Sequence, residues 1–325
     1  LSYAVEFALV TVFAALCYRQ LQGERGWWLW TAVLLGLIGG VRQNTLVFLL
    51  PLWLVCLWPL RWRERCLSLA LVSTVTVGWL VPMVALSGGF DGYQAALGAS
   101  TTDVASESSF LAPAQLVLNA GRMTLYLGYG LLLAALPLVW IVWEVGRCWR
   151  KLARDQRVWV LALWISPALI FYLVVHLRQH GHIFTFLPAV LLLAGWGVVR
   201  LSERLRRELL QRAVLIGSVT SLVYVNVAFF LIAPASLLGS QCLPLQTPSW
   251  QTIRQRDQYL EARITAIYSH FDPATTAVWS RGIYFRHPDY YFHNFRHPGL
   301  GHEVAAEPML LSSDIETLVL FDPEA

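Results

Sequence analysis

The sequence has few charged residues for its length. Charged side chains make up 14% of the 325 residues and hydrophobic side chains make up 57%, with a mean hydropathy of +0.54. A soluble globular protein carries about 25% charged residues, and a single soluble core could not bury so much apolar surface. The scarcity of charge therefore favours a membrane protein. The net charge of +4 is distributed in a membrane pattern, described below, and does not indicate a nucleic-acid partner.

Motifs of the common soluble chemistries are also missing. The sequence contains no Walker loop, Rossmann fingerprint, HExxH or GxSxG motif. The five cysteines have neither disulfide nor zinc spacing, so we expect them to be small packing residues. The first apolar run lacks the charged segment and cleavage site of a signal peptide.

What the sequence does have is a series of long apolar runs. A helix needs roughly 20 apolar residues to cross the hydrocarbon core of a bilayer. Gly36, Gly39 and Gly40 in the second run would let neighbouring backbones approach closely. The fold class predicted is an all-α polytopic membrane region over residues 1–233, followed by a tail over residues 234–325. The eight predicted spans are 2–19, 27–41, 44–60, 66–87, 122–145, 158–176, 183–200 and 213–233.

Basic residues alternate between successive loops. The loops after the first, third, fifth and seventh spans hold fifteen Lys and Arg residues, whereas the other loops hold only Arg42, Arg122 and Arg178. The positive-inside rule places the larger set in the cytoplasm. The first span then runs from outside to inside, so we expect an odd number of spans before Leu1. The tail is expected outside, in the periplasm of a bacterial source.

Two outer segments are long enough to have structure of their own. Residues 88–120 are polar and rich in small side chains, which favours a partly ordered loop over an outward cavity, with disorder as the alternative. The tail is expected to form a small α/β appendage. Its helix would begin at Thr247 and Pro248, an N-cap and an N1 proline, and "TAVWS" and "TLVLF" would be short buried strands. The expected apolar face of this helix carries Ile253, Leu260, Ile264 and Ile267.

Candidate site residues gather on the predicted outer side. In "GLIGGVRQNT", Arg42 is the lone basic residue of its loop and stands beside Gln43. An Arg at a helix end can bind a phosphate bidentately, and the alternative is an interfacial Arg that snorkels. Glu6 lies near the outer end of the first span, where a carboxylate is costly unless it faces a cavity or a partner. We expect Glu6 to belong to the same site, with a solvated helix-end carboxylate as the alternative.

Two further clusters have mixed cationic and aromatic character. "HLRQHGHIFTFLPA" supplies His176, Arg178, Gln179 and His182 between the sixth and seventh spans. Its three histidines lack additional ligands, so we predict no metal site, and the cluster is either a polar rim for an anionic headgroup or a plain wet loop. "SRGIYFRHPDYYFHNFRHPGLGH" in the tail offers aromatic rings for sugar faces and an Arg for their polar groups, with a solvated loop as the alternative. The side chains in question are Arg286, His287, Tyr290 and Tyr291.

Four segments together resemble a known family. "YAVEFALVTVFAA", "LLGLIGGVRQNTLVFLLPLWL", "LVVHLRQHGHIFTFLPAVLLLAGWG" and "FRHPDYYF" are similar to bacterial membrane glycosyltransferases of family 39. These are GT-C-fold proteins related to lipid A aminoarabinose transferases and protein mannosyltransferases. The resemblance implies transfer of a sugar from a polyprenyl-phosphate donor to a lipid, glycan or protein acceptor at the outer face of the bacterial inner membrane. A divalent cation assists some members, although nothing in this sequence indicates a site for one.

The resemblance also implies roles for individual residues. Arg42 would stabilise the leaving phosphate, and the donor site would include Gln43, His176, Arg178 and Gln179, with Arg286 and Tyr290 at its outer rim. The family's presumed catalytic base lies in the first outer loop, which we expect upstream of Leu1. The sequence is therefore expected to be an N-terminally truncated and inactive part of the enzyme.

One departure from the family pattern and two other functions leave alternatives open. His182 stands where relatives are expected to have Tyr, which leaves the role of that position in doubt. A transporter or lipid flippase is one alternative function, although it predicts internal repeats and mid-membrane charges that the sequence lacks. A noncatalytic membrane scaffold with an outer sensing tail is the other alternative.

Overall fold

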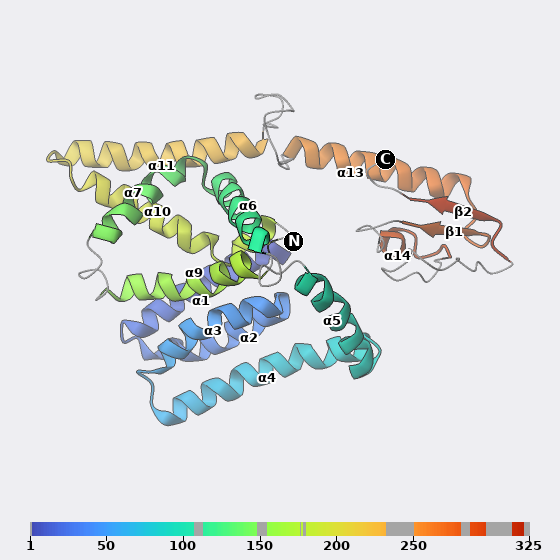
Figure 1. The fold of residues 1–325 in the computed structure, drawn as a ribbon, viewed down its shortest axis with the longest axis horizontal. Coiled ribbons are helices and arrows are strands. Elements are labelled where there is room, and N and C mark those ends of the chain that lie inside the picture. The colour runs from blue at the N-terminus through green and yellow to red at the C-terminus, as the bar shows by residue number, and fades with distance from the viewer. Residues whose placement is uncertain are drawn as a thin grey trace. The chain divides into compact units, whose positions relative to one another are not determined.

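The computed structural model describes residues 2–106, 113–147, 155–175, 177, 180–231, 250–280, 287–296 and 314–321. The chain divides into two compact units, Leu1–Val225 and Asn226–Ala325, and each is described by itself (Figure 1). The predicted domain boundary between residues 233 and 234 lies outside the described residues.

The first four helices match the first four predicted spans. They are α1 (Ser2–Leu21), α2 (Trp28–Val41), α3 (Gln43–Leu57) and α4 (Trp62–Leu86), with a short 3-10 helix η1 (Arg25–Trp27) before α2. At the start of α4 the Glu64 carboxylate accepts from the Arg61 backbone N–H at 2.8 Å. This contact satisfies a backbone N–H at the beginning of the helix.

Small residues on α2 let α4 pack closely against it, as the sequence predicts. A Cβ atom at Gly36 would meet the Val75 side chain, and one at Gly40 would meet the Trp79 ring. The Trp79 Nε1–H also donates to the Gly36 carbonyl oxygen at 2.9 Å. The glycines therefore create the space into which two α4 side chains fit.

The segment 88–120 differs from the predicted loop. Residues Gly89–Ser106 form α5, and the following span begins at Pro113 rather than at residue 122. The Gly and Ser content favoured a loop, but the Ala-Ala-Leu centre of α5 has high helix propensity and the helix packs against α4. The span itself comprises α6 (Pro113–Leu131), the 3-10 turn η2 (Leu132–Ala134) and α7 (Ala135–Arg147), with Leu132 in the left-handed region at φ 44°.

Four more elements complete the first unit. They are α9 (Gln156–Val174), the 3-10 helix η3 (His180–Thr185), α10 (Leu187–Ser202) and α11 (Glu208–Leu231), whose last turns fall in the second unit. The Asp155 carboxylate caps α9 by accepting from the Arg157 backbone N–H at 2.9 Å. Pro188 occupies the first turn of α10, where its missing N–H leaves no bond unmade.

Five helical stretches in the described part of the chain are long and apolar enough to cross a membrane. They are Tyr3–Leu21, Trp62–Leu86, Ala114–Glu144, Gln156–Val174 and Glu208–Ala228, and α2, α3 and α10 are shorter apolar helices. The apolar window of α4 is 6% buried and that of α11 is 0% buried. Exposed apolar faces of this size are unusual for a water-soluble monomer and suit a lipid environment. The count of eight spans remains a prediction.

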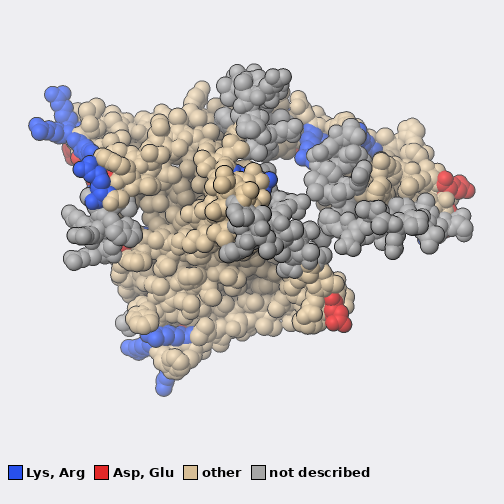
Figure 2. All heavy atoms as spheres, viewed as in Figure 1, with Lys and Arg blue, Asp and Glu red and all other residues tan. Residues whose placement is uncertain are grey.

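The helices of the first unit run back and forth between two ends. In Figure 1 the connections after α1, α3 and α10 lie at the left-hand end, and the α2–α3 connection lies at the other. Figure 2 shows basic side chains of this unit gathered at the left-hand end. The alternation of basic loops in the sequence thus corresponds to one basic end in the structure.

Apolar and small side chains fill the centre of the first unit. The largest buried side chains there include Trp53, Trp164 and Phe13. Cys17 and Cys56 are buried among them, and the Cys56 thiol donates to the Cys17 carbonyl at 3.6 Å, so these two cysteines are packing residues as predicted.

The second unit contains the predicted small α/β fold. Its elements are α13 (Trp250–His270), β1 (Thr276–Trp279), α14 (His287–Tyr291) and β2 (Thr317–Leu320). The two strands are parallel, with Thr276 opposite Thr317 and Trp279 opposite Leu320. The predicted helix start at Thr247 and Pro248 lies outside the described residues. The core consists of Ile267, Val278, Phe292, Phe295 and Phe321, with Leu260 and Ile264 packed against it.

Candidate functional site

A buried carboxylate, that of Glu6 on α1, lies inside the first unit. Its side chain is 0% exposed. Oε1 accepts from the Thr45 hydroxyl at 2.5 Å and from the Thr185 hydroxyl at 2.7 Å, while Oε2 accepts from Arg42 Nη1 at 3.0 Å. A buried carboxylate is tolerated only when it is paired and hydrogen-bonded, and Glu6 meets both conditions. It links three segments that are far apart in the sequence.

Arg42 reaches Glu6 from the break between α2 and α3. Its backbone is extended, at φ −151° and ψ 111°, which ends α2 and allows α3 to begin at the next residue. Its guanidinium carbon lies 4.5 Å from the centre of the Tyr3 ring, a cation–π distance. The side chain is 17% exposed. Arg42 is therefore held on one side by a carboxylate and on another by an aromatic face.

The two threonines are fixed by their own elements. Thr45 lies in the first turn of α3 and its backbone N–H donates to the Arg42 carbonyl at 3.1 Å. Thr185 ends η3, and its carbonyl accepts from the buried Trp164 Nε1–H of α9 at 2.8 Å. The hydroxyls of both residues are thus positioned by main-chain contacts before they bond to Glu6.

Aromatic rings of η3 and α1 pack together next to this ion pair. The Phe184 ring meets the Tyr3 and Phe7 rings edge to face, at centroid distances of 6.0 and 6.1 Å. Gly181 lies directly against the Tyr3 ring, and a Cβ atom at this position would collide with it. The absence of a side chain at Gly181, the glycine of "HLRQHGHIFTFLPA", therefore allows η3 to approach α1 closely.

His182 adjoins the site through the ring of Tyr172. Its ring stacks on the Tyr172 ring of α9 at a centroid distance of 4.9 Å and an interplanar angle of 12°. Tyr172 is buried and also contacts the Phe48 ring of α3 at 5.4 Å. His182 is consequently packed against an aromatic stack that includes α3 and α9.

Arg122 and Asn119 tie α6 to the segment after α9. Arg122 Nη1 donates to the Leu177 carbonyl at 3.2 Å, and the buried Asn119 amide donates to the Leu173 carbonyl at 3.1 Å. Asn119 thus satisfies a carbonyl oxygen in the last turn of α9, where the C=O groups lack helical partners, and Arg122 binds a carbonyl beyond the helix end.

The structure brings some of the predicted site residues together and places others elsewhere. Glu6 and Arg42 are brought together. Gln43 instead turns toward α4 and α5, where its amide donates to the Tyr93 hydroxyl at 3.2 Å. Tyr290 belongs to the second unit, is 78% exposed and meets Tyr291 edge to face at 4.9 Å. His176, Arg178, Gln179 and Arg286 lie outside the described residues.

Sequence reasoning missed the threonines and tyrosines of the site. Thr45 lies three residues after Arg42 and Thr185 lies in the "FTFLP" segment, so both were within quoted motifs. Their small hydroxyls carry no charge and gave no signal of their own. Tyr3 and Tyr172 lie in apolar runs where aromatic residues are expected to pack.

The two charged side chains differ in how fully their hydrogen-bonding groups are engaged. Guanidinium carries five N–H donors, so the contact with Glu6 does not exhaust Arg42. The Glu6 oxygens, by contrast, are engaged by a cation and two hydroxyl donors. Among the residues that the structure describes, no three His, Cys, Asp or Glu side chains gather into a metal-binding group.

Comparison with known proteins gives no match: none is found with a family model, a curated protein or a solved structure.

Proposed function

We propose that this chain is the donor-binding part of a multi-pass membrane glycosyltransferase of the bacterial inner membrane. The donor would be a polyprenyl-phosphate sugar, the acceptor a lipid, glycan or protein hydroxyl, and the second unit would lie outside the membrane. The observation that supports this proposal is the Glu6–Arg42 pair at the helix ends (3.0 Å), a guanidinium fixed in place within an apolar region. The four segments similar to family 39 glycosyltransferases supply the reaction class.

The proposed chemistry depends on the guanidinium N–H donors of Arg42 that do not bind Glu6. When the sugar leaves a polyprenyl phosphate, negative charge develops on the phosphate oxygens. Guanidinium donors that are already oriented stabilise this charge without reorganising. Glu6 and Tyr3 supply that orientation, since one binds a guanidinium nitrogen and the other lies under the guanidinium plane. Glu6 is a positioning residue in this scheme.

Lipid-phosphate binding and sugar transfer can be measured separately. The chain in nanodiscs would bind a labelled polyprenyl phosphate, and we expect Arg42→Ala to weaken this binding by about tenfold or more, because a charge-assisted bond is worth about 1.5–3 kcal/mol. Arg42→Lys should retain only part of the affinity, since an ammonium cannot bind bidentately. Arg63→Ala is the matched control, because Arg63 is an exposed Arg in the first turn of α4. Unchanged binding by Arg42→Ala would contradict the proposed binding of the lipid phosphate by Arg42.

The full-length protein tests the reaction itself. A labelled polyprenyl-phosphate sugar should transfer its sugar to an acceptor, and Arg42→Ala should lower turnover more than it raises the donor KM if the guanidinium acts on the leaving phosphate. Normal turnover in this variant would contradict the proposal.

A lipid flippase is the second candidate function, and one observation favours it. The buried Glu6–Arg42 pair lies where two short helices, α2 and α3, meet at an extended residue. Ionisable residues at interrupted helices mark substrate pathways in transporters. Translocation of a labelled polyprenyl-phosphate lipid across liposomes, without sugar transfer by the full-length protein, would support this function over the enzyme.

A further inference from the structure

Two pockets flank the seam between α10 and α11. The first has a volume of about 570 Å³ and lies between η2, α7, α10 and α11. The second has a volume of about 520 Å³ and lies between α1, α10 and α11. Val198 of α10 and Leu222 of α11 border both pockets. The two cavities therefore lie on opposite sides of the same pair of helices.

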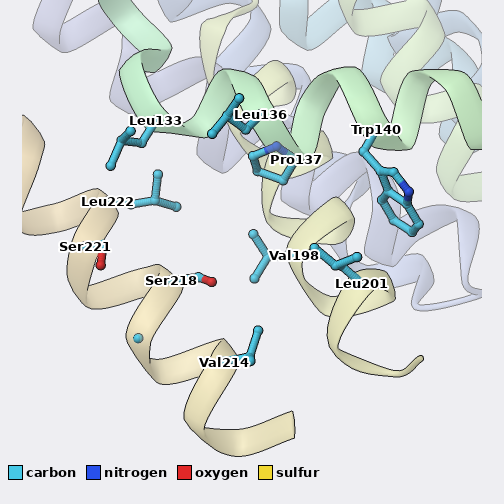
Figure 3. Close-up of a pocket in the computed structure, with 11 residues that line it drawn as sticks. Leu133, Leu136, Pro137, Trp140, Val198, Leu201, Val214, Ser218, Ser221 and Leu222 are labelled. Carbon is cyan, nitrogen blue, oxygen red and sulfur yellow. The ribbon is translucent and has the colours of Figure 1, made fainter. Parts of the chain in front are cut away.

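Apolar and small side chains line both cavities. Figure 3 shows Leu222 of α11 opposite Leu133, and Ser218 of α11 pointing toward Val198 of α10. A Cβ atom at Gly217 would meet nothing within 4 Å, so this stretch of α11 does not pack tightly against its neighbours. The apolar window of α11 is 0% buried. A hydrocarbon chain would satisfy these surfaces better than water would.

Each pocket contains a tryptophan with an arginine over its ring. Trp140 lines the first pocket, and the Arg204 guanidinium lies 4.7 Å from its ring centre. Trp196 lines the second, and the Arg200 guanidinium lies 5.8 Å from its ring centre. Both arginines lie at the end of α10 or just after it, so the same end of each pocket is marked by an amphipathic ring and a cation. Tryptophan favours the headgroup level of a bilayer.

The turn that joins α10 to α11 adds unpaired positive charge. Arg206 and Arg207 are exposed, and within the described ranges neither forms an ion pair. The acidic groups nearby are already engaged, because Glu144 pairs with Arg204 at 3.2 Å, Glu203 with Arg200 at 3.2 Å and Glu208 with Arg212 at 4.0 Å. Figure 2 shows a blue cluster in the region where Figure 1 places this turn. The net charge of the turn is positive.

We propose that the α10–α11 seam binds one anionic phospholipid. Its acyl chains would occupy the two apolar pockets, one on each side of the seam, and its headgroup phosphate would bind Arg206 and Arg207 on the connecting turn. Charge complementarity decides the occupant: an anionic phospholipid brings a net negative charge to the two arginines, whereas a zwitterionic lipid or an apolar helix brings none. Basic pockets between membrane helices bind anionic headgroups in this way. The proposal rests on the membrane placement of α10 and α11 and does not depend on the role of Arg42.

Native mass spectrometry of the whole chain can identify the lipid. The protein would be released from nanodiscs that contain equal amounts of phosphatidylglycerol and phosphatidylcholine with the same acyl chains. We expect one phosphatidylglycerol to remain bound in preference to phosphatidylcholine. Each basic residue near a lipid surface contributes about 1 kcal/mol, so the double variant Arg206→Gln/Arg207→Gln should lose roughly tenfold or more of this retention. The matched control is Arg61→Gln/Arg63→Gln, which removes two exposed arginines from the basic α3–α4 turn instead.

A second pair of variants tests the pockets. Ser218→Trp would fill the first pocket from α11, whereas Ile216→Trp places the same bulk on an exposed α11 residue that lines neither pocket. Loss of the bound lipid in Ser218→Trp alone, with both variants unfolding at the wild-type temperature, supports the proposal. Three results would overturn it: equal retention of the two lipids, retention unaffected by the double Gln variant, or a Ser218-dependent dimer with no lipid, which would make the seam an interface between two copies.

Discussion

Glu6 and Arg42 form an ion pair at 3.0 Å although 36 residues separate them in the sequence. The pair joins the first turns of α1 to the break between α2 and α3, and through Thr185 it reaches η3 as well. One carboxylate therefore organises three segments at one end of the helices. Because its side chain is fully buried, each of its contacts should have a measurable energy.

Removal of Glu6 should be costly because it leaves a mostly buried guanidinium without its counter-charge. Loss of one partner of a buried pair destabilises proteins by about 3–5 kcal/mol. We expect Glu6→Ala to lower the thermal unfolding midpoint of the detergent-solubilised protein strongly. Glu203→Ala breaks the exposed Arg200–Glu203 pair and is the control, since surface pairs contribute about 0–1 kcal/mol. Similar midpoints for the two variants would show that the Glu6 pair contributes no more than a surface pair.

The two threonines should act through the same carboxylate oxygen. Thr45→Val and Thr185→Val each remove a hydroxyl donor from Glu6 Oε1 while keeping the side-chain shape. Hydrogen bonds to charged groups contribute about 1.5–3 kcal/mol, so each variant should be destabilised by about this amount. The double variant measured by the same unfolding assay should depart from additivity, because the residues share an acceptor. Additive effects would mean that the two hydroxyls do not act on one group.

Sequence patterns predicted the helices better than they predicted the site. The apolar runs and the small residues Gly36 and Gly40 are local signals, and the structure has the helices and the close α2–α4 packing that they indicate. The α5 helix was not predicted, because its Gly and Ser residues resemble those of loops, although its Ala-Ala-Leu centre has high helix propensity and it contacts α4.

Within the site, the sequence alone pointed to the charged residues but not to their neutral partners. A lone Arg42 and a Glu6 in an apolar run are each conspicuous, because a charge within a span needs a reason. Thr45, Thr185 and Tyr3 are unremarkable residues for helices and loops, and only the fold shows that they meet the same ion pair. Partners 36 and 179 residues from Glu6 in sequence leave no local periodicity to detect.

The contact between Gly181 and Tyr3 predicts a loss of stability that a second substitution should partly restore. A methyl group at residue 181 would collide with the Tyr3 ring, so Gly181→Ala should displace η3 from α1 and destabilise the protein by about 1–3 kcal/mol. Tyr3→Ala removes the obstacle, and the double variant should therefore recover part of the loss relative to Gly181→Ala. Gly195→Ala is the control, since a Cβ atom there meets nothing within 4 Å and Ala has the higher helix propensity. An additive loss in the double variant would show that the ring is not the obstacle.

The native cysteine Cys66 can test the orientation that the basic loops predict. Cys66 is exposed near the start of α4, beside the basic α3–α4 turn, whereas Cys17 and Cys56 are buried. In a variant with Cys148→Ser and Cys242→Ser, a membrane-impermeant maleimide added to intact cells with a permeabilised outer envelope should leave Cys66 unlabelled until the inner membrane is opened. Ser87→Cys at the opposite end of α4 should be labelled from outside. The reverse pattern would invert the topology and place Arg42 on the cytoplasmic side, and labelling of both positions from outside would show that α4 does not cross the membrane.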